Sequence, residues 1–306
     1  MPWFGIKIAQ GLYISNFINT TNYGTFTTIY SMQPAKKSYG QHFLVNEDTA
    51  KRIASFIDHL PEGSNLVEIG PGRGMLTKYL LAKPVNLLAI EADADMITHL
   101  TQHYEGIQNH LLSMDFLKVN MGKLFEGQEF TIIGNFPYNI SSQIVFKMLN
   151  SVELVPEMVG MFQKEMAERI IAPPGGKDYG VISVITQAYY EGSMLMKLAP
   201  GSFNPPPKVH SAVIRLKRKE EFRLPCNERL FRTIVKLSFG QRRKMLRNTL
   251  KNIVEDASIL SDPYYNLRPE QLSVEEFINL THKIEKHLKH EPGNQNNGGS
   301  EGSHEG

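Results

Sequence analysis

The sequence predicts an α/β fold in which a mainly parallel β-sheet carries helices on both faces and a small all-helical domain follows. Two observations lead to this prediction. Between residues 65 and 163, short apolar runs alternate with amphipathic ones, and the apolar runs are nearly continuous, which is typical of strands buried on both faces. Beyond about residue 218, only helical patterns occur. The chain has 306 residues, enough for one large domain and one small domain.

The expected elements follow one another in a regular order. Five apolar runs of strand length are expected to form the sheet: residues 65–70, 85–91, 107–115, 129–135 and 156–163. Three amphipathic runs are expected to form the helices that accompany them: residues 75–82, 94–104 and 141–150. The later helices are expected at residues 228–239, 241–254 and 268–288. We therefore expect a ligand-binding domain over residues 32–218 and a helical domain over residues 219–288.

The two ends of the chain differ in composition from the rest. Residues 1–31 contain one basic residue, Lys7, and no acidic residue. They do not match a secretory signal, because polar and glycine residues interrupt the apolar run and no small-residue cleavage site follows it. Met32 stands directly before QPAKKSYGQHFL, where the first domain is expected to begin. We expect residues 1–31 to be a disordered or untranslated extension, and the Gly/Asn/Ser/Glu-rich residues 289–306 to be a disordered tail.

The composition argues against several classes of protein. No apolar run approaches the roughly 20 residues that a membrane-spanning helix needs, so no membrane association is expected. The single cysteine, Cys226, cannot form an internal disulfide and fits a reducing cytoplasm. No cluster of cysteine and histidine has the spacing of metal ligands, so no metal is expected.

The charge of the chain is unevenly distributed. The net charge is +2, but residues 208–251 contain 14 lysines and arginines and three acidic residues, which gives this segment a charge of +11. One concentrated basic segment in an otherwise acidic chain indicates an anionic partner that binds at one place. The alternative is a solvated helix face that binds nothing.

A glycine-rich segment, VEIGPGRGMLT, joins the first expected strand to the first expected helix. Gly70 and Gly72 allow the backbone to approach a ligand closely, and the helix that follows directs its N–H groups toward that ligand. A dinucleotide site needs glycine where Met75 stands, and a phosphate-binding loop needs a Gly-Lys-Ser/Thr sequence that is absent here. Pro71 also removes one N–H group. The segment therefore predicts a ligand without a pyrophosphate, or else a simple tight turn.

Acidic residues end the next two expected strands. Glu91 ends the second strand, where its carboxylate can accept hydrogen bonds from both hydroxyls of a ribose; Asp115 ends the third, where it can bind an adenine amino group. Each acid taken alone is more often a helix cap or a solvated loop residue. Together, at the sheet edge where α/β proteins bind ligands, they indicate an adenosine pocket without polyphosphate, and S-adenosylmethionine fits that description.

The fourth expected strand ends in Asn135-Phe136-Pro137-Tyr138, beside the same pocket. Methylation of an amino group on a base needs oxygen acceptors that hold the amine hydrogens and localise the nitrogen lone pair. The side chain of Asn135 and a backbone carbonyl at Pro137, in a turn that proline keeps rigid, would provide two such oxygens. Tyr138 would stack on the base, which must leave any helix to be reached. The alternative is a strand-to-helix turn with no chemical role.

These segments resemble those of the ribosomal RNA adenine dimethyltransferase family, and specifically its small-subunit branch. The resemblance covers about residues 34–288 and rests on motifs in the right order: KKSYGQHFL, VEIGPGRGMLT, NFPY, FNPPPKVHSAVIRL and FGQRRKMLRNTL. It implies a Rossmann-like class I methyltransferase domain and cofactor contacts at Gln41, His42, Leu44, Gly70, Gly72, Glu91, Asp115 and Asn135. It also implies a catalytic role for the residues 135–138, with Phe203 facing Tyr138 across the target adenine. Phe136 stands where Leu is commoner in the family, and His42 stands where some members have Asn.

The resemblance also implies the reaction and its substrate. The expected activity is the S-adenosylmethionine-dependent dimethylation of two adjacent adenines in a hairpin loop near the 3′ end of small-subunit (16S) rRNA, with a role in small-subunit biogenesis. The expected partner is the immature small ribosomal subunit, bound by a cytoplasmic monomer. The residues expected to contact rRNA are Lys208, Arg242, Arg243, Lys244 and Arg247. Phosphate contacts of this kind give affinity and position rather than sequence choice.

Three other functions remain open from the sequence. A large-subunit rRNA methyltransferase that confers antibiotic resistance has the same fold, but PPPKVHSAVIRL and RRKMLRN resemble the small-subunit branch better. A nucleic-acid-binding factor without activity would not need Glu91, Asp115 and the Asn-Phe-Pro-Tyr motif. A small-molecule methyltransferase would leave the basic segment without a role. A further hypothesis is an assembly checkpoint, in which the protein holds an immature small subunit until methylation releases it.

Overall fold

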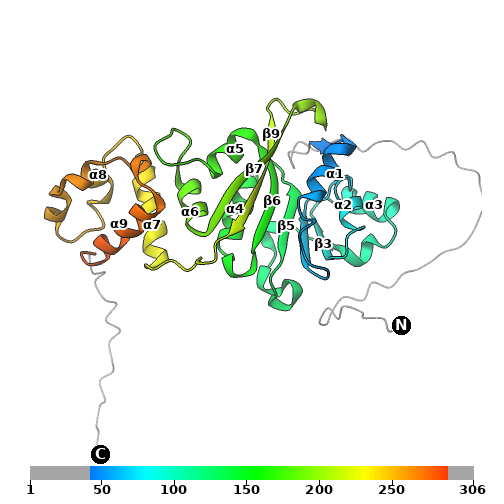
Figure 1. Ribbon diagram of the computed structural model, residues 1–306, viewed down its shortest axis with the longest axis horizontal. Helices are drawn as coiled ribbons and strands as arrows, with labels where there is room; N and C mark the ends of the chain where they lie inside the picture. The colour runs from blue at the N-terminus through cyan, green and yellow to red at the C-terminus, as the bar shows by residue number, and fades with distance from the viewer. Residues whose placement is uncertain (1–41, 289–306) are drawn as a thin grey trace, which may run out of the picture. The chain divides into compact units, whose positions relative to one another are not determined.

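The computed structural model describes residues 42–288 of the chain (Figure 1). The predictions made for residues 1–31, for Gln41 and for residues 289–306 lie outside the described residues. Seven strands form the main sheet in the order β4-β3-β2-β5-β6-β9-β7. Their bounds are β2 Asn65–Ile69, β3 Asn86–Glu91, β4 Leu111–Ser113, β5 Thr131–Asn135, β6 Glu157–Gln163, β7 Tyr190–Leu198 and β9 Ser211–Arg218.

The sheet is mainly parallel, as predicted. The pairings from β4 through β3, β2 and β5 to β6 are all parallel, whereas β9 runs antiparallel to both of its neighbours, β6 and β7. The chain builds outward from β2 to β4 and then places β5 on the other side of β2. In open α/β sheets such a reversal creates a ligand-binding crevice at the carboxyl ends of the two central strands, here β2 and β5.

Helices cover both faces of the sheet (Figure 1). Those of the described chain are α1 Glu47–Ser55, α2 Thr77–Leu80, α3 Ala94–His103, α4 Ser141–Leu149, α5 Lys164–Ile170, α6 Val181–Tyr189, α7 Glu228–Gly240, α8 Leu246–Leu250 and α9 Val274–Glu285. On β5, Ile132 packs into one apolar cluster with α4 and α6, whereas Ile133 packs into a second cluster with α1 and α2. On β6, Met158 packs into the first of these clusters and Val159 into the second. The strands therefore read as continuous apolar runs because side chains of alternating direction are buried on both sides.

The segment after residue 218 is helical, as predicted, and it packs on the helices that cover the sheet. Phe231 and Ile234 of α7 and Phe277 of α9 are fully buried in the same apolar cluster as Ile185 of α6. The division of the chain into domains over residues 32–218 and 219–288 stays a prediction. None of the helices among residues 42–288 combines the length and the apolar character needed to cross a membrane.

Four predicted elements are shorter in the structure by four residues or more. In the run 107–115, a left-handed turn at Gly106 (φ +79°) leads into a 3₁₀-helix, Ile107–His110, so only β4 remains as strand. The expected helix 75–82 is reduced to α2, because the glycine turn continues to residue 76. The expected helix 241–254 is reduced to α8, and the last helix begins only after Ser273, which forms a capping box with Glu276.

A second, two-stranded sheet lies beside the crevice. Strand β1 (Phe43–Leu44) pairs antiparallel with β8 (Phe203–Asn204). The backbone N–H of Val45 also donates to the carbonyl of Ser202 at 2.9 Å. The beginning of the described chain is therefore held beside the carboxyl ends of the strands.

Two glycines make room for one ring beneath the crevice. Gly134 of β5 and Gly160 of β6 are paired across the sheet, and the buried ring of Phe136 lies against both. A Cβ on Gly160 would lie 2.4 Å from the Phe136 ring and 2.6 Å from the Phe162 ring. These two rings meet edge to face, with centroids 5.2 Å apart. The ring of Phe136, packed in the space beside these two glycines, therefore fixes the turn that follows β5.

We expect Gly160→Ala to lower the free energy of unfolding by about 1–3 kcal/mol, because a methyl group there overpacks a core with no free space. Urea denaturation followed by circular dichroism would measure the change. Gly201→Ala is the matched control: no atom lies within 4 Å of its added Cβ, so its effect should stay within about 0.5 kcal/mol. Equal stability of the two variants would contradict this account of the packing.

A carboxyl group is buried inside the sheet. Glu68 of β2 is 1% exposed, and its Oε2 has no hydrogen-bond partner among the described residues. Burial raises the pKa of Glu68 to about 8, and the nearby carboxylate of Glu91 acts in the same direction. The side chain is therefore protonated in the folded, ligand-free protein at neutral pH.

The pKa of Glu68 predicts a pH dependence of stability. Between about pH 4.5 and pH 8 the folded state keeps the proton that the unfolded state has lost, so stability falls as the pH rises through this window and the loss is complete above it. We expect the difference in free energy of unfolding between wild type and Glu68→Gln to change by up to about 1.4 kcal/mol per pH unit. Urea titrations of both proteins at several pH values measure this difference. A pH-independent difference would show that Glu68 ionises normally.

Candidate active site

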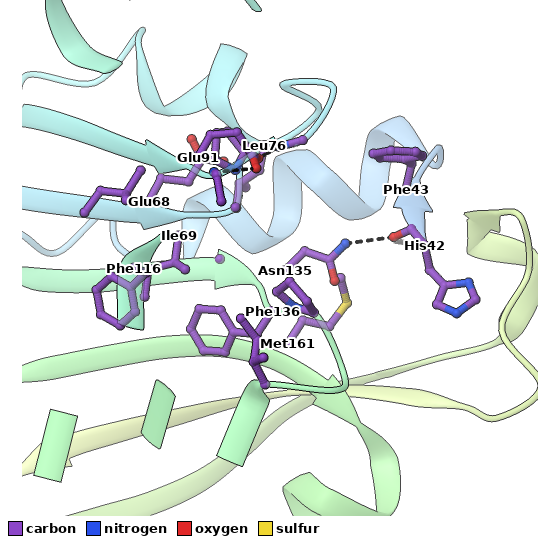
Figure 2. Close-up of a pocket in the computed structure, with 18 of the residues that line it drawn as sticks. His42, Phe43, Glu68, Ile69, Leu76, Glu91, Phe116, Asn135, Phe136 and Met161 are labelled. Atoms are coloured by element: carbon purple, nitrogen blue, oxygen red, sulfur yellow. Dashed lines mark hydrogen bonds between the residues drawn. The ribbon is translucent and has the colours of Figure 1, made fainter. Parts of the chain in front are cut away.

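A cavity of about 500 Å³ lies at the carboxyl ends of β2, β3 and β5, where the strand order reverses (Figure 2). This is the crevice that the topology predicts. It brings together most of the residues expected from the sequence to bind the cofactor or to act in catalysis: His42, Leu44, Gly70, Gly72, Glu91, Asp115, Asn135, Phe136, Pro137 and Tyr138. Phe203 and the expected rRNA-binding residues are not part of its wall.

The glycine turn between β2 and α2 forms one wall of the cavity. Gly72 has a left-handed backbone (φ +56°), and a Cβ there would lie 3.2 Å from the ring of Phe43. The guanidinium of Arg73 lies over the same ring, 4.3 Å from its centroid. The turn therefore packs against β1; its expected close approach to a ligand stays a prediction.

The carboxylate of Glu91 ties the end of β3 to the glycine turn. Its Oε1 accepts hydrogen bonds from the N–H groups of Ala92 (2.8 Å) and Asp93 (2.9 Å), and its Oε2 accepts one from Gly72 (3.1 Å). Burial raises the pKa of Glu91, and these three N–H groups oppose the rise. The expected contact between Glu91 and ribose hydroxyls stays a prediction.

Asp115 caps a turn, which is one of the two roles weighed from the sequence; its expected contact with an adenine amino group stays a prediction. Its Oδ1 accepts from the N–H of Leu117 at 2.9 Å and so caps a 3₁₀-turn, Phe116–Lys118. The residue also lines the cavity, next to the buried ring of Phe116. A turn cap and a ligand contact are therefore compatible here, since the carboxylate has a second oxygen.

Asn135 links the end of β5 to the start of the described chain. Its Nδ2 donates to the backbone carbonyl of His42 at 3.1 Å (Figure 2). This bond orients the amide, and within residues 42–288 its oxygen has no hydrogen-bond partner. At the neighbouring turn, the carbonyl of Pro137 accepts from the N–H of Ile140 at 3.2 Å, which leaves that oxygen one further lone pair.

Tyr138 is held on two sides. Its hydroxyl lies 2.6 Å from Oγ of the buried Ser211, the first residue of β9. Its ring lies 5.4 Å from the ring of His42, whose Nδ1 is 2.8 Å from the carbonyl of Pro205. Burial raises the pKa of Tyr138, and the bond to Ser211 opposes the rise. The aromatic face is thus fixed at the edge of the cavity.

Phe203 occupies a different place from the other predicted site residues. It is 3% exposed and packs with Leu44, its partner across the β1–β8 pair, in the smaller apolar cluster. The structure therefore does not bring Phe203 to the cavity wall. Its expected position across a bound adenine from Tyr138 stays a prediction.

The sequence did not single out several residues that line the cavity. Three of them carry ionisable side chains: Glu68, Arg73 and Lys118. The only signal for Glu68 was an acid inside the apolar run NLVEIG. Phe43 and Met161 are apolar wall residues without a distinguishing pattern. Phe116 could have been found, because it directly follows Asp115 at the end of a predicted strand.

The expected rRNA-binding residues differ in how they are engaged. Lys208, Arg243, Lys244 and Arg247 are exposed. The guanidinium of Arg242 instead donates to the backbone carbonyls of Gly176, at 2.7 Å, and of Lys177, and it lies 3.9 Å from the carboxylate of Glu270.

The residues of the cavity fit S-adenosylmethionine. A volume of about 500 Å³ is within the usual range for a ligand of this size. Glu91 and Asp115 offer acceptors for hydroxyl and amino groups, and Ile90 and Phe116 offer apolar surface for a base. The buried Oε2 of Glu68, which has no hydrogen-bond partner among residues 42–288, is an acceptor for a hydrogen-bond donor on a ligand. No group of His, Cys, Asp and Glu among residues 42–288 has the arrangement of a metal site.

Comparisons with known proteins agree with this geometry. The family model for ribosomal RNA adenine dimethylase matches residues 32–287. A relative from Flavobacterium johnsoniae, named ribosomal RNA small subunit methyltransferase A, is 51% identical over 251 residues, 82% of this chain and 96% of that protein. A relative of the same name from Bacteroides thetaiotaomicron is 48% identical over 255 residues, 83% of this chain and 95% of that protein.

A solved structure extends the comparison to three dimensions. A dimethyladenosine transferase from Plasmodium falciparum matches with a TM-score of 0.69 at 25% identity, covering 81% of this chain and 100% of that one. The Rossmann-like class I methyltransferase fold expected from the sequence is thereby confirmed. Residues 32–287, which the family model matches, include the glycine turn, the Asn-Phe-Pro-Tyr turn and the helical segment. The chain belongs to the ribosomal RNA adenine dimethylase family.

Proposed function

We propose that the protein transfers methyl groups from S-adenosylmethionine to the exocyclic amino groups of two adjacent adenines near the 3′ end of small-subunit rRNA. One observation carries this proposal: acceptors for an adenosine and the Asn-Phe-Pro-Tyr turn meet at one cavity, in a chain of the ribosomal RNA adenine dimethylase family. The name of the relatives, small subunit methyltransferase A, supports small-subunit rRNA as the substrate.

The cofactor would be held by residues at three strand ends. Glu91 at β3 receives its ribose hydroxyls, Asp115 after β4 receives its adenine amino group, and the glycine turn after β2 packs against it. S-adenosylmethionine, when bound, supplies a methyl group on a positively charged sulfur. A positive charge held near Glu68 would lower the pKa of its carboxyl group and favour loss of its proton to solvent.

The target amine would be held by the turn after β5. Its lone pair is delocalised into the adenine ring, which makes the free amine a poor nucleophile. The side-chain oxygen of Asn135 and the backbone carbonyl at Pro137 accept the two amine hydrogens and so direct the lone pair toward the cavity. The nitrogen gains a methyl group and loses one proton to water. The second transfer uses the one hydrogen that remains on the nitrogen.

Tyr138 would provide the face on which the target base stacks. The base must leave its own stack to enter the cavity, and an aromatic platform compensates part of that cost, about 1–3 kcal/mol per base. The hydroxyl of Ser211 holds this platform in one orientation. Most of the rate would then come from orientation and electrostatics.

The exposed cations of the helical segment would bind the rRNA backbone. Arg243, Lys244 and Arg247 lie between α7 and α8 or on α8 and are exposed. Arg242 has its guanidinium on backbone carbonyls, so we assign it the role of holding the loop at Gly176 instead of a phosphate contact. We also propose that the protein acts as a cytoplasmic monomer on the immature subunit, and that methylation releases it.

We expect Asn135→Ala to lower the rate of methyl transfer by about 100- to 1,000-fold, the usual effect of removing one such polar contact from a transition state. The measurement is transfer from labelled S-adenosylmethionine to unmethylated small subunits, with products mapped by nuclease digestion and mass spectrometry. Asn109→Ala, at an exposed position of the 3₁₀-helix after Gly106, is the matched control and should keep full activity.

Three outcomes would contradict the proposal in different ways. Transfer to large-subunit RNA alone would favour the resistance branch. Binding of subunits without any transfer would favour a factor that lacks activity. Full activity of Asn135→Ala would exclude its side chain as the amine acceptor while leaving the reaction in place.

We expect the combined change of Arg243, Lys244 and Arg247 to Ala to reduce the salt dependence of subunit binding. Each lost phosphate contact should lower the slope of log K against log salt by about 0.7–0.9. Arg242→Ala should instead leave the slope unchanged and lower the melting temperature, because its guanidinium binds backbone carbonyls. Filter binding at several salt concentrations, with thermal melts of both variants, separates the two roles; a reduced slope for Arg242→Ala would return it to the rRNA surface.

A further inference from the structure

The wall segment Asp115–Val119 is capped at both ends. At its start, Oδ1 of Asp115 accepts from the N–H of Leu117 at 2.9 Å. At its end, Nζ of Lys147 donates to the carbonyls of Leu117, at 3.0 Å, and of Val119, at 2.7 Å. A turn this short has few hydrogen bonds of its own. Its own bonds run from the N–H of Lys118 to the carbonyl of Asp115 (2.9 Å) and from the N–H of Val119 to the carbonyl of Phe116 (3.1 Å), and the two side chains provide the rest of its support.

Lys147 reaches this turn from a different element of the fold. It lies on α4, the helix that begins three residues after Tyr138. Its ammonium is 5.7 Å from the centroid of the Phe116 ring, and the residue is half-buried. Partial burial lowers the pKa of Lys147, and the charge of Asp115 opposes this shift. An ammonium group kept in such a place satisfies carbonyl groups that would otherwise face apolar side chains.

The cap at Asp115 leaves one of its two carboxylate oxygens for a ligand. That oxygen can recognise a 6-amino group only if the turn holds it at the right height and angle, because a hydrogen bond weakens steeply away from linearity. Phe116, which follows directly, lines the same part of the cavity. Whatever fixes the turn therefore fixes both the polar and the apolar contacts of the base.

We propose that Lys147 is a positioning residue for cofactor recognition: it locks the Asp115–Val119 turn so that Asp115 reads the 6-amino group of the cofactor's adenine. It does so from the helix that follows the Asn-Phe-Pro-Tyr turn, so the adenine end of the cavity and the methyl-accepting end share one support. The inference rests on the proposed cofactor. The inference does not depend on the RNA substrate, because the test uses no RNA.

The test is a comparison of two ligands by isothermal titration calorimetry. S-adenosylhomocysteine carries the 6-amino group, and S-inosylhomocysteine has an oxygen in its place, which Asp115 should repel. We expect Lys147→Met to bind S-adenosylhomocysteine about tenfold more weakly than wild type, the loss of roughly one charge-assisted hydrogen bond. The affinity for S-inosylhomocysteine should change by less than about threefold, so the preference for adenine over hypoxanthine should fall.

Three further variants make the result specific. Asp115→Asn should lose the same preference, which identifies the contact through which Lys147 acts. Lys147→Arg keeps a cationic donor and should retain most of the preference. Lys123→Met, an exposed lysine on the next 3₁₀-helix, is the matched control and should bind both ligands as wild type does. If Lys147→Met fails to fold in a thermal melt, Lys147→Gln, which keeps a donor of shorter reach, takes its place.

Two results would overturn the inference. An equal loss of affinity for both ligands would mean that Lys147 only stabilises the fold, and an unchanged preference would mean that its contacts do not matter for recognition. In both cases wild-type binding of S-adenosylhomocysteine would still support the proposed cofactor. A wild-type protein that binds neither ligand would overturn the cofactor assignment and the inference with it.

Discussion

The site depends on one packing constraint: the ring of Phe136 fills the space that Gly134 and Gly160 leave between β5 and β6. With that ring buried, the backbone must leave the strand in a fixed direction, which places Asn135 before it and Tyr138 after it on the cavity. Both neighbouring residues are then tied to distant segments by hydrogen bonds. The polar geometry of the site is therefore anchored in an apolar contact, and such contacts tolerate little change in volume.

Three carboxyl groups line the cavity, and each has a different environment. Glu91 has backbone N–H groups on both oxygens, which oppose the rise in its pKa on burial; Asp115 has one N–H group and a nearby ammonium; and Glu68 keeps its proton. A cluster of acids near a low-dielectric cavity would otherwise repel itself. The arrangement favours a ligand that brings hydrogen-bond donors and positive charge.

Much of the fold was predictable because its signals are local. Strands buried on both faces leave apolar runs, and acids at strand ends leave their mark where those runs stop, as at Glu91. The shortened elements failed where a local turn interrupted a good pattern, as at Gly106. Contacts between distant segments leave no such trace: nothing in the sequence indicates that Lys147 caps a turn before it, or that Phe203 packs behind Leu44. The sequence also does not distinguish an arginine whose guanidinium binds backbone carbonyls, such as Arg242, from any other basic residue.

The antiparallel strand β9 lies between β6 and β7 although it follows both in the chain. While the polypeptide is being translated, β6 is an open edge and β7 lacks its neighbour in the sheet until Ser211–Arg218 has left the ribosome. The pairing of β1 with β8 waits as long, since His42 and Pro205 are 163 positions apart. The nascent chain thus completes its cavity in one late step. A truncated product released before that point would carry the glycine turn, Glu91 and Asp115 without a complete site. It would also present an unpaired strand edge to other chains.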